Sequence, residues 1–136
     1  MSASENVPEG FTSNQRSSPL TAPWEPIWRR ECEQAVQLGL RVAEPHCNAR
    51  GFAHGGLIAS LADNAMGLSL AGVAGASGAV TVHLSVDYVR AVQRGQWLQI
   101  EPRVVRLGKS LGVVDALITA DGEVVARADA TFRISP

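Results

Sequence analysis

Residues 55–74 read GGLIASLADNAMGLSLAGVA and form the longest uniform segment of the chain. Apolar side chains recur in it at helical spacing and cover most of the helix circumference: Leu57, Leu61, Ala65 and Leu68, with Ile58, Ala62, Met66 and Leu70 beside them. A helix that is apolar nearly all round lies in a protein core. We therefore predict one long buried helix over residues 55–74, ended by the glycine-rich run Gly72–Gly78.

The same segment is also long enough to cross a bilayer. It carries Asp63 near its centre, however, and an acid at that depth costs about 3 kcal/mol even on a lenient scale. It also lacks flanking aromatic anchors and a cluster of lysines and arginines. We therefore expect the core helix of a soluble protein, with no membrane as partner.

Downstream of the helix, apolar and polar residues alternate with the period of two that is typical of a half-buried strand. The alternation is clearest in residues 80–88, VTVHLSVDY. Turn signals such as Asp121-Gly122 separate three further segments of this kind. They predict strands over Trp97–Leu107, Leu111–Ala120 and Glu123–Ile134. Together these four segments predict an antiparallel meander.

Upstream of the helix, residues 37–44 alternate in the same way and predict a first strand, which the loop 45–53 connects to the helix. Residues 24–33 suggest a short helix that packs on the body through Trp24, Ile27 and Trp28. Residues 1–21 are rich in Ser, Asn, Pro and Glu, which predicts a disordered or loosely packed N-terminal arm. Residues 22–136 then form a single domain.

This order of elements indicates an α+β domain in which an antiparallel sheet wraps around one long central helix, the architecture of the hotdog fold. A chain of 136 residues suffices for one such domain. The net charge of −1 argues against a nucleic-acid partner. Cys32 and Cys47 match neither a disulfide framework nor a zinc site, so we expect no metal, and they are compatible with a reducing cytoplasm.

Asp63 is the one charged residue between Arg50 and Asp87. A carboxylate on a core helix loses hydration, which costs several kcal/mol unless something compensates. Asp63 could simply bind a neighbouring backbone group or pair with an arginine. Desolvation could instead raise its pKa and suit it to act as a general base.

The run His54-Gly55-Gly56 lies where the helix begins. Two glycines let a ligand approach the backbone closely, and the first N–H groups of a helix point outward at the positive end of its dipole. This could be an oxyanion hole for a thioester carbonyl, or an ordinary glycine-rich turn.

Gly55 and Asp63 are eight residues apart, which separates them by about 12 Å along one helix. One carbonyl therefore cannot contact both of them in the same chain. Two copies of the helix running antiparallel would bring each Gly55 to the other copy's Asp63, and a two-fold dimer gives two such sites. If the acid and the glycines cooperate, the protein must be at least a homodimer.

The motif in which Asn48 is followed by five residues, His54-Gly55-Gly56, and an acid nine positions after the histidine resembles the PaaI-type hotdog thioesterases. Residues 79–90 and 106–110 also resemble strand patterns of that family, so the similarity extends from about Leu38 to Phe132. His83 departs from the acid often found at its position in relatives. The resemblance implies hydrolysis of an aryl-, short- or medium-chain acyl-CoA to the free acid and CoA, by an enzyme that is commonly a homotetramer.

The resemblance also implies roles for individual residues. Asp63 would be the nucleophile or the general base, and the Gly55 N–H would bind the oxyanion. Asn48 and His54 would place the thioester or the water from the subunit opposite Asp63, and Thr81 would assist the attacking water. From the residues alone, Asn48 could equally make an Asx-turn and Thr81 could reflect strand propensity.

Contacts to CoA are expected from Gly56, Gly108 and three cations, Arg90, Arg106 and Lys109, although each cation alone could be a solvated turn charge. No separate cofactor is expected, because CoA is part of the substrate. Two rival functions share this fold, a hydratase or dehydratase and a non-catalytic acyl-CoA binder. The spacing of the motif argues against the first, and the intact Asp63 argues against the second.

Overall fold

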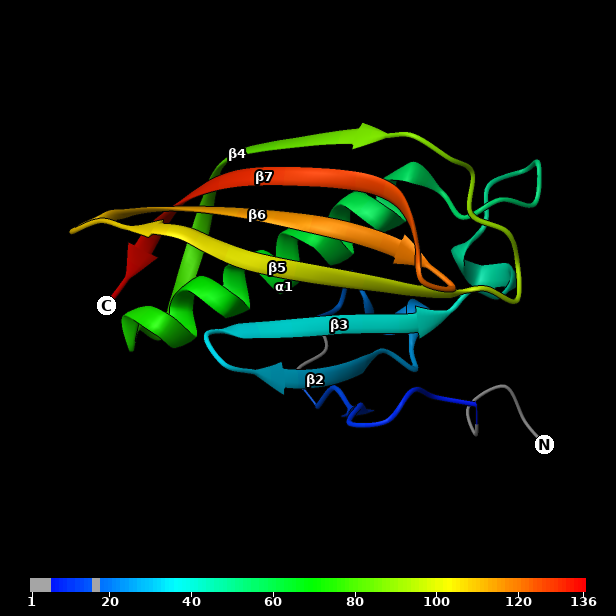
Figure 1. The fold of residues 1–136 in the computed structure, drawn as a ribbon, viewed down its shortest axis with the longest axis horizontal. Coiled ribbons are helices and arrows are strands. Elements are labelled where there is room, and N and C mark those ends of the chain that lie inside the picture. The colour runs from blue at the N-terminus through cyan, green and yellow to red at the C-terminus, as the bar shows by residue number, and fades with distance from the viewer. Residues whose placement is uncertain (1–5, 16–17) are drawn as a thin grey trace.

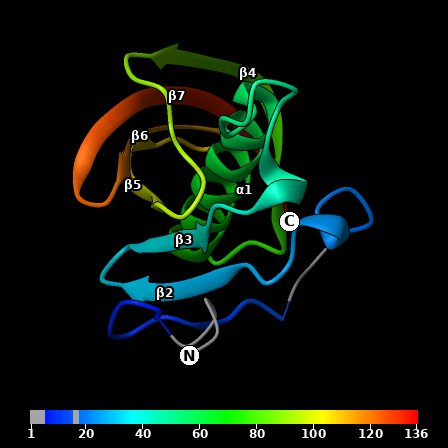
Figure 2. The same ribbon diagram turned by 90° about the vertical axis from the view of Figure 1, so that its right-hand side faces the viewer.

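One antiparallel sheet curls around a single long helix in the computed structural model, which describes residues 6–15 and 18–136 (Figures 1 and 2). The helix is α1 (Gly55–Ala74). The strands of the described part are β1 (Thr12–Ser13), β2 (Trp28–Cys32), β3 (Ala35–Arg41), β4 (Gly78–Tyr88), β5 (Trp97–Leu107), β6 (Leu111–Ala120) and β7 (Glu123–Ser135). Two short 3₁₀ helices, η2 (Ala22–Trp24) and η3 (Glu44–His46), lie before α1. This confirms the predicted hotdog architecture.

Helix α1 has the bounds that the sequence predicts. His54 caps its first turn by accepting a hydrogen bond from the Gly56 N–H, and Gly75 ends it in the left-handed region at φ 64°. Its buried side chains pack into the concave face of the sheet: Leu57, Ile58, Leu61, Ala62, Ala65, Met66, Ser69 and Leu70. By length and composition α1 could cross a membrane, but in the structure it is the core helix of the domain.

The sheet order is β1-β2-β3-β5-β6-β7-β4, so the predicted meander is confirmed for β5, β6 and β7 but is wrong for β4. Strand β4 pairs with β7 at one edge, and β5 pairs with β3 instead, with Leu38 opposite Ile100. Local alternation identifies strands but not their neighbours. The neighbours follow from burying the inward faces of β3 and β5 together against α1, where Leu38 and Ile100 are at most 1% exposed.

The predicted short helix over residues 24–33 is also wrong. Half of this segment is strand β2, which pairs with β3 and places Trp28 opposite Gly39. The apolar spacing of Trp24, Ile27 and Trp28 fits a helix, but Pro26 lacks the N–H that a helix interior needs. Strand pairing with β3 satisfies the backbone instead.

Part of the predicted N-terminal arm packs on the domain. Strand β1 pairs with β2, and the buried Phe11 ring meets Trp97 edge-on at 5.2 Å between centroids. The Arg30 guanidinium lies 4.5 Å from the centre of the same ring. Residues 1–5 and 16–17 of the arm lie outside the described residues.

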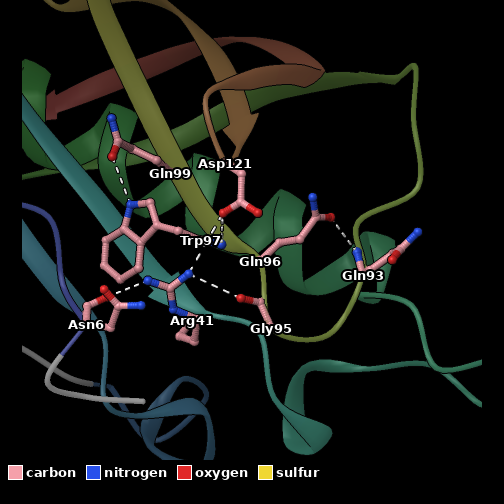
Figure 3. Close-up of polar contacts among 8 residues, drawn as sticks. All are labelled: Asn6, Arg41, Gln93, Gly95, Gln96, Trp97, Gln99 and Asp121. Atoms are coloured by element: carbon pink, nitrogen blue, oxygen red, sulfur yellow. Dashed lines mark hydrogen bonds and ion pairs between the residues drawn. The ribbon is translucent and has the colours of Figure 1, made fainter. Parts of the chain in front are cut away.

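Arg41 connects three segments at the end of the sheet where β3 stops (Figure 3). Its guanidinium donates to the backbone oxygens of Asn6 and of Gly95, the latter at 3.1 Å, and lies 3.8 Å from Asp121. Asp121 also accepts from the backbone N–H of Trp97 at 2.9 Å, and the Trp97 ring lies under the guanidinium. We call these five residues the Arg41 cluster. It ties the N-terminal segment, the β4–β5 loop and the β6–β7 turn together.

Candidate active site

Asp63 lies next to the edge strand of the sheet. It projects from the middle of α1, and its Oδ1 accepts a hydrogen bond of 2.6 Å from the hydroxyl of Thr81 on β4. The second carboxylate oxygen makes no hydrogen bond to the residues that the structure describes. This arrangement fixes the carboxylate and leaves one oxygen able to accept a proton.

The surroundings of Asp63 differ in part from the prediction of a dehydrated core acid. The side chain is half-buried, and it faces a cavity of about 390 Å³ that is lined by residues of α1 and of strands β2, β3, β4 and β7. No ion pair joins Asp63 to any residue within 6–15 or 18–136. The alternative of an arginine partner is therefore not realised in the described chain.

The start of α1 carries a second group of functional candidates. The Nδ1 of His54 accepts a hydrogen bond of 2.8 Å from the Gly56 N–H, which commits that amide to the helix cap. The Gly55 N–H has no acceptor among the described residues. It is thus the Gly55 amide, rather than that of Gly56, that is free to bind an oxyanion.

Tyr88 holds Gly55 in place and was not among the residues singled out from the sequence. Its hydroxyl donates to the Gly55 carbonyl oxygen, and burial raises the pKa of this phenol, so it stays protonated at neutral pH. A Cβ on Gly55 would lie 3.3 Å from the Tyr88 ring. This close approach explains the glycine. A signal in the sequence is that Tyr88 is the chain's one tyrosine, at the end of a strand.

Asn48 makes the loop contacts of an Asx-turn. Its side-chain oxygen accepts from the N–H groups of Arg50 at 3.0 Å and Phe52 at 3.2 Å. These bonds shape the loop that leads into His54. Any contact between Asn48 and a substrate would have to come from its remaining amide donors.

One chain gathers these residues into two separate groups. Asp63 and Thr81 form the first, and Gly55, His54 and Tyr88 form the second. Asp63 lies eight positions after Gly55 on α1, which separates the two groups by about 12 Å. Asp63, Thr81, Gly55 and Tyr88 share one surface, which we call the open edge. Apolar side chains of β4 are exposed beside it, including Val80 at 58% and Val82 at 61%.

The residues predicted to contact CoA lie at opposite ends of the sheet. Arg90 follows β4 and forms an ion pair with Glu123 at the β6–β7 turn. Arg106, Gly108 and Lys109 belong to the β5–β6 hairpin at the other end (Figure 1). A strand of eleven residues separates these ends by about 35 Å. Arg90 therefore cannot bind the same phosphate group as Arg106 and Lys109 of its own chain.

No group of three metal-ligating side chains occurs in the described part of the chain. His46 instead has a structural role. It is buried, its Nδ1 accepts from the Ala43 N–H at 2.9 Å, and its Nε2 lies 2.8 Å from the backbone oxygen of Trp24. The His46 carbonyl also accepts from the His54 N–H, so His46 braces the entry to α1.

The sequence matches one family model and several curated proteins. The model described as the thioesterase superfamily matches residues 50–126. PA0474 of Pseudomonas aeruginosa, which is named as an esterase, is 36% identical over 95% of this chain and 98% of its own length. Human acyl-coenzyme A thioesterase 13 is 32% identical over 65% of this chain and 64% of its own length.

Solved structures resemble the fold over most of its length. The protein smu.793 of Streptococcus mutans, solved bound to acetyl-CoA, has a TM-score of 0.69 with 32% identity, over 75% of this chain and 82% of that one. A variant of the phenylacetic acid degradation protein PaaI of Thermus thermophilus has a TM-score of 0.77 with 21% identity. The match covers 88% of this chain and all of the PaaI chain, and it bears on the fold alone.

Proposed function

The chain belongs to the thioesterase superfamily, and we propose that it hydrolyses acyl-CoA thioesters to the free acid and CoA at a site shared by two copies of the chain. The observation that carries this proposal is the open edge. There, the Thr81-bound carboxylate of Asp63 and the Gly55 amide, which has no acceptor within the described chain, lie on one surface about 12 Å apart.

Asp63 acts as the general base in this proposal. Its free oxygen takes a proton from a water molecule, whose oxygen attacks the thioester carbonyl carbon while Thr81 holds the carboxylate. The Gly55 N–H of the second copy binds the developing oxyanion. When the tetrahedral intermediate collapses, the C–S bond breaks, and the CoA thiolate takes back the proton from Asp63. Products are the carboxylic acid and CoA. His54 and Asn48, from the copy that supplies Gly55, position the thioester and the water.

Attack by Asp63 itself is the alternative, with an acyl anhydride as intermediate. The two routes differ in where oxygen from the solvent appears. A single turnover in ¹⁸O-labelled water should place the label in the released acid and none in Asp63. Label in the Asp63 carboxyl group, found by mass spectrometry, would assign the nucleophilic route.

The shape of the open edge supports a two-fold dimer. Thr81 lies beside Asp63 and Tyr88 lies beside Gly55, so α1 and β4 run antiparallel with two fixed points of contact. An axis that passes near Ala59 on α1 and between the two contact points on β4 brings each Asp63 to the other copy's Gly55. The β4 edges then pair, which covers their exposed backbone and valines.

The same dimer would bring together the residues that are expected to contact CoA. Because the two copies run antiparallel along β4, Arg90 of one copy approaches the β5–β6 hairpin of the other. That hairpin carries Arg106, Gly108 and Lys109, whose cations would bind the phosphates of CoA.

A second interface on the outer face of the sheet would complete a homotetramer. The apolar side chains that point away from α1 there are Val105, Leu107, Leu111, Val113 and Leu117, between 37% and 53% exposed. Leu117→Glu should leave a dimer with unchanged activity per chain, as measured by native mass spectrometry and CoA release.

Both cysteines are free thiols, which fits the cytoplasmic location that we also propose.

Subunit complementation tests the shared site. Asp63→Asn removes the base, and Gly55→Pro removes the oxyanion donor, so each homodimer should be inactive. A heterodimer purified through two different tags has one site with both lesions and one with neither, and should recover about half of the wild-type activity. If Asp63 and Gly55 of the same chain formed a site, the heterodimer would be as inactive as its parents.

A further inference from the structure

The cavity beside Asp63 extends well past the reacting groups. It begins at Asp63 and Thr81 and is lined along α1 as far as Gly72. Nine helical residues span about 13 Å, and the cavity volume is about 390 Å³. An acyl group whose thioester carbon is held at Asp63 therefore has room to extend along α1 within the same chain.

The middle of this cavity is apolar. Side chains from three strands and from α1 form its walls: Leu38, Leu68, Ala71, Ala79 and Phe132. Gly67 and Gly72 add no side chain to the floor. Methylene groups of an acyl chain suit this part of the cavity, because it offers apolar surface for them to bury.

The cavity wall also carries a cation. Arg29 on β2 is the one basic residue among the described residues that line it. Arg29 pairs with Leu38 across the sheet, and cross-strand partners point to the same face, so its side chain lies on the α1 side. The Arg29 side chain is 23% exposed.

The guanidinium of Arg29 makes one side-chain hydrogen bond within the described chain. One nitrogen donates to Glu31 at 2.7 Å, and Glu31 is 73% exposed, so this pair is weak and exchangeable. The remaining donors have no hydrogen bond to the described residues. Asn14 also lines the cavity.

The surroundings of Arg29 disfavour a hydrocarbon terminus, because a methyl group would desolvate the guanidinium without replacing its hydrogen bonds with water. A carboxylate fits better, since it can accept two parallel hydrogen bonds from the guanidinium fork. A hydroxyl group could accept only one bond and would leave the charge of Arg29 uncompensated.

Building on the proposed hydrolysis at Asp63, we propose that Arg29 recognises a carboxylate at the far end of the acyl group. The substrates are then CoA monothioesters of medium-chain dicarboxylic acids. Arg29 acts as a specificity residue, and the Asp63 chemistry is the same for every acyl group.

Three thioesters of equal chain length test this assignment: suberoyl-CoA, octanoyl-CoA and the ω-hydroxy analogue of octanoyl-CoA. The wild-type enzyme should have its highest kcat/KM with suberoyl-CoA. Arg29→Leu should lower kcat/KM for suberoyl-CoA about 10- to 100-fold and leave octanoyl-CoA unchanged or improved, and Arg29→Lys should retain part of the preference. An equal loss with all three thioesters would overturn the proposal, because Arg29 would then bind the CoA part.

Glu31→Gln is the matched control, since Glu31 competes for Arg29 but does not line this cavity. It should raise kcat/KM for suberoyl-CoA roughly two- to fivefold without changing kcat/KM for octanoyl-CoA.

Binding of free suberate and octanoate, measured by calorimetry, separates recognition from turnover. Suberate should bind more tightly to the wild type and no more tightly to Arg29→Leu. If none of the thioesters is hydrolysed yet suberate shows this pattern, the hydrolysis fails and the Arg29 contact stands; equal binding of both acids overturns the contact.

Discussion

The Arg41 cluster and the open edge lie on the same domain but differ in how their polar groups are satisfied. In the Arg41 cluster, the guanidinium donates to two backbone oxygens and lies beside the Asp121 carboxylate within one chain, although its buried Nε has no partner among the described residues. On the open edge, the Gly55 N–H and one oxygen of Asp63 have no partner among the described residues. The first region therefore stabilises the fold, whereas the second is complete only with a second copy and a substrate.

Asp63→Asn should show the largest difference between an effect on activity and an effect on stability. The change removes the base but keeps the size of the side chain, so kcat should fall about 1,000-fold or more. The melting temperature should hardly change, because the side chain's contact in the described chain is the Thr81 hydroxyl. CoA release measures the activity, and calorimetry measures the stability.

Asp115→Asn serves as the control for this experiment. Asp115 lies on β6, on the face of the sheet away from α1, where it pairs with Arg103. Its loss should leave kcat unchanged. Normal turnover by Asp63→Asn would contradict the role of Asp63 in catalysis.

Gly55→Pro tests the other half of the open edge. Proline is tolerated at the first position of a helix, and His54 has the extended backbone, φ −67° and ψ 134°, that a residue before proline needs. The change removes the free N–H, so kcat should fall about 100-fold or more. Gly55→Ala adds a Cβ next to Tyr88 but keeps the N–H. If both variants lose the same activity, crowding against Tyr88 rather than the amide is responsible.

The sequence predicts the elements of the fold better than their pairing. The bounds of α1, β5 and β6 are confirmed to the residue, because a helix apolar all round and alternating strands between turn signals are local patterns. The pairing of β4 with β7 depends on contacts between distant segments, which no local pattern contains. Strand β2 was mistaken for a helix because the spacing of its aromatic residues fits both.

The candidate site also has residues that the sequence predicts and contacts that it does not. Asp63 and the glycines of the helix start stand out in the sequence, as a lone acid and as a flexible turn at a helix end. The bond from Thr81 to Asp63 and the contact of Tyr88 with Gly55 join β4 to α1 across the fold. Arg29 could not be assigned at all from the sequence, because its place in the cavity wall depends on β2 being a strand beside β3.

Arg41→Met tests whether the Arg41 cluster stabilises the fold. The methionine keeps much of the apolar stem but leaves the backbone oxygens of Asn6 and Gly95 without their donor. The free energy of unfolding should fall by about 2 to 3 kcal/mol, with kcat/KM of the folded enzyme unchanged. Urea unfolding measures the first quantity. Arg94→Met is the control, because Arg94 is exposed and forms no ion pair within the described chain, and it should change stability by less than about 0.5 kcal/mol.

The smallest expected effect is a pH dependence of stability that comes from His46, which supports the entry to α1 from inside the fold. Burial lowers the pKa of its imidazole below the ordinary 6.5, although the hydrogen bond to Trp24 opposes this. The neutral ring fits the site, because its Nδ1 accepts from the Ala43 N–H, and a proton there would abolish that bond. The unfolded chain thus binds a proton at higher pH than the folded chain does. The contribution of His46 is therefore full above pH 6.5 and is lost as the pH falls through the lowered pKa of the folded state.

Urea unfolding at pH 7.5 and pH 5.5 measures this effect as a difference between variants. The wild type should lose more stability on acidification than His46→Gln, whose side chain does not titrate. Equal pH dependence in wild type and His46→Gln would show that His46 is not the group that couples protonation to the fold.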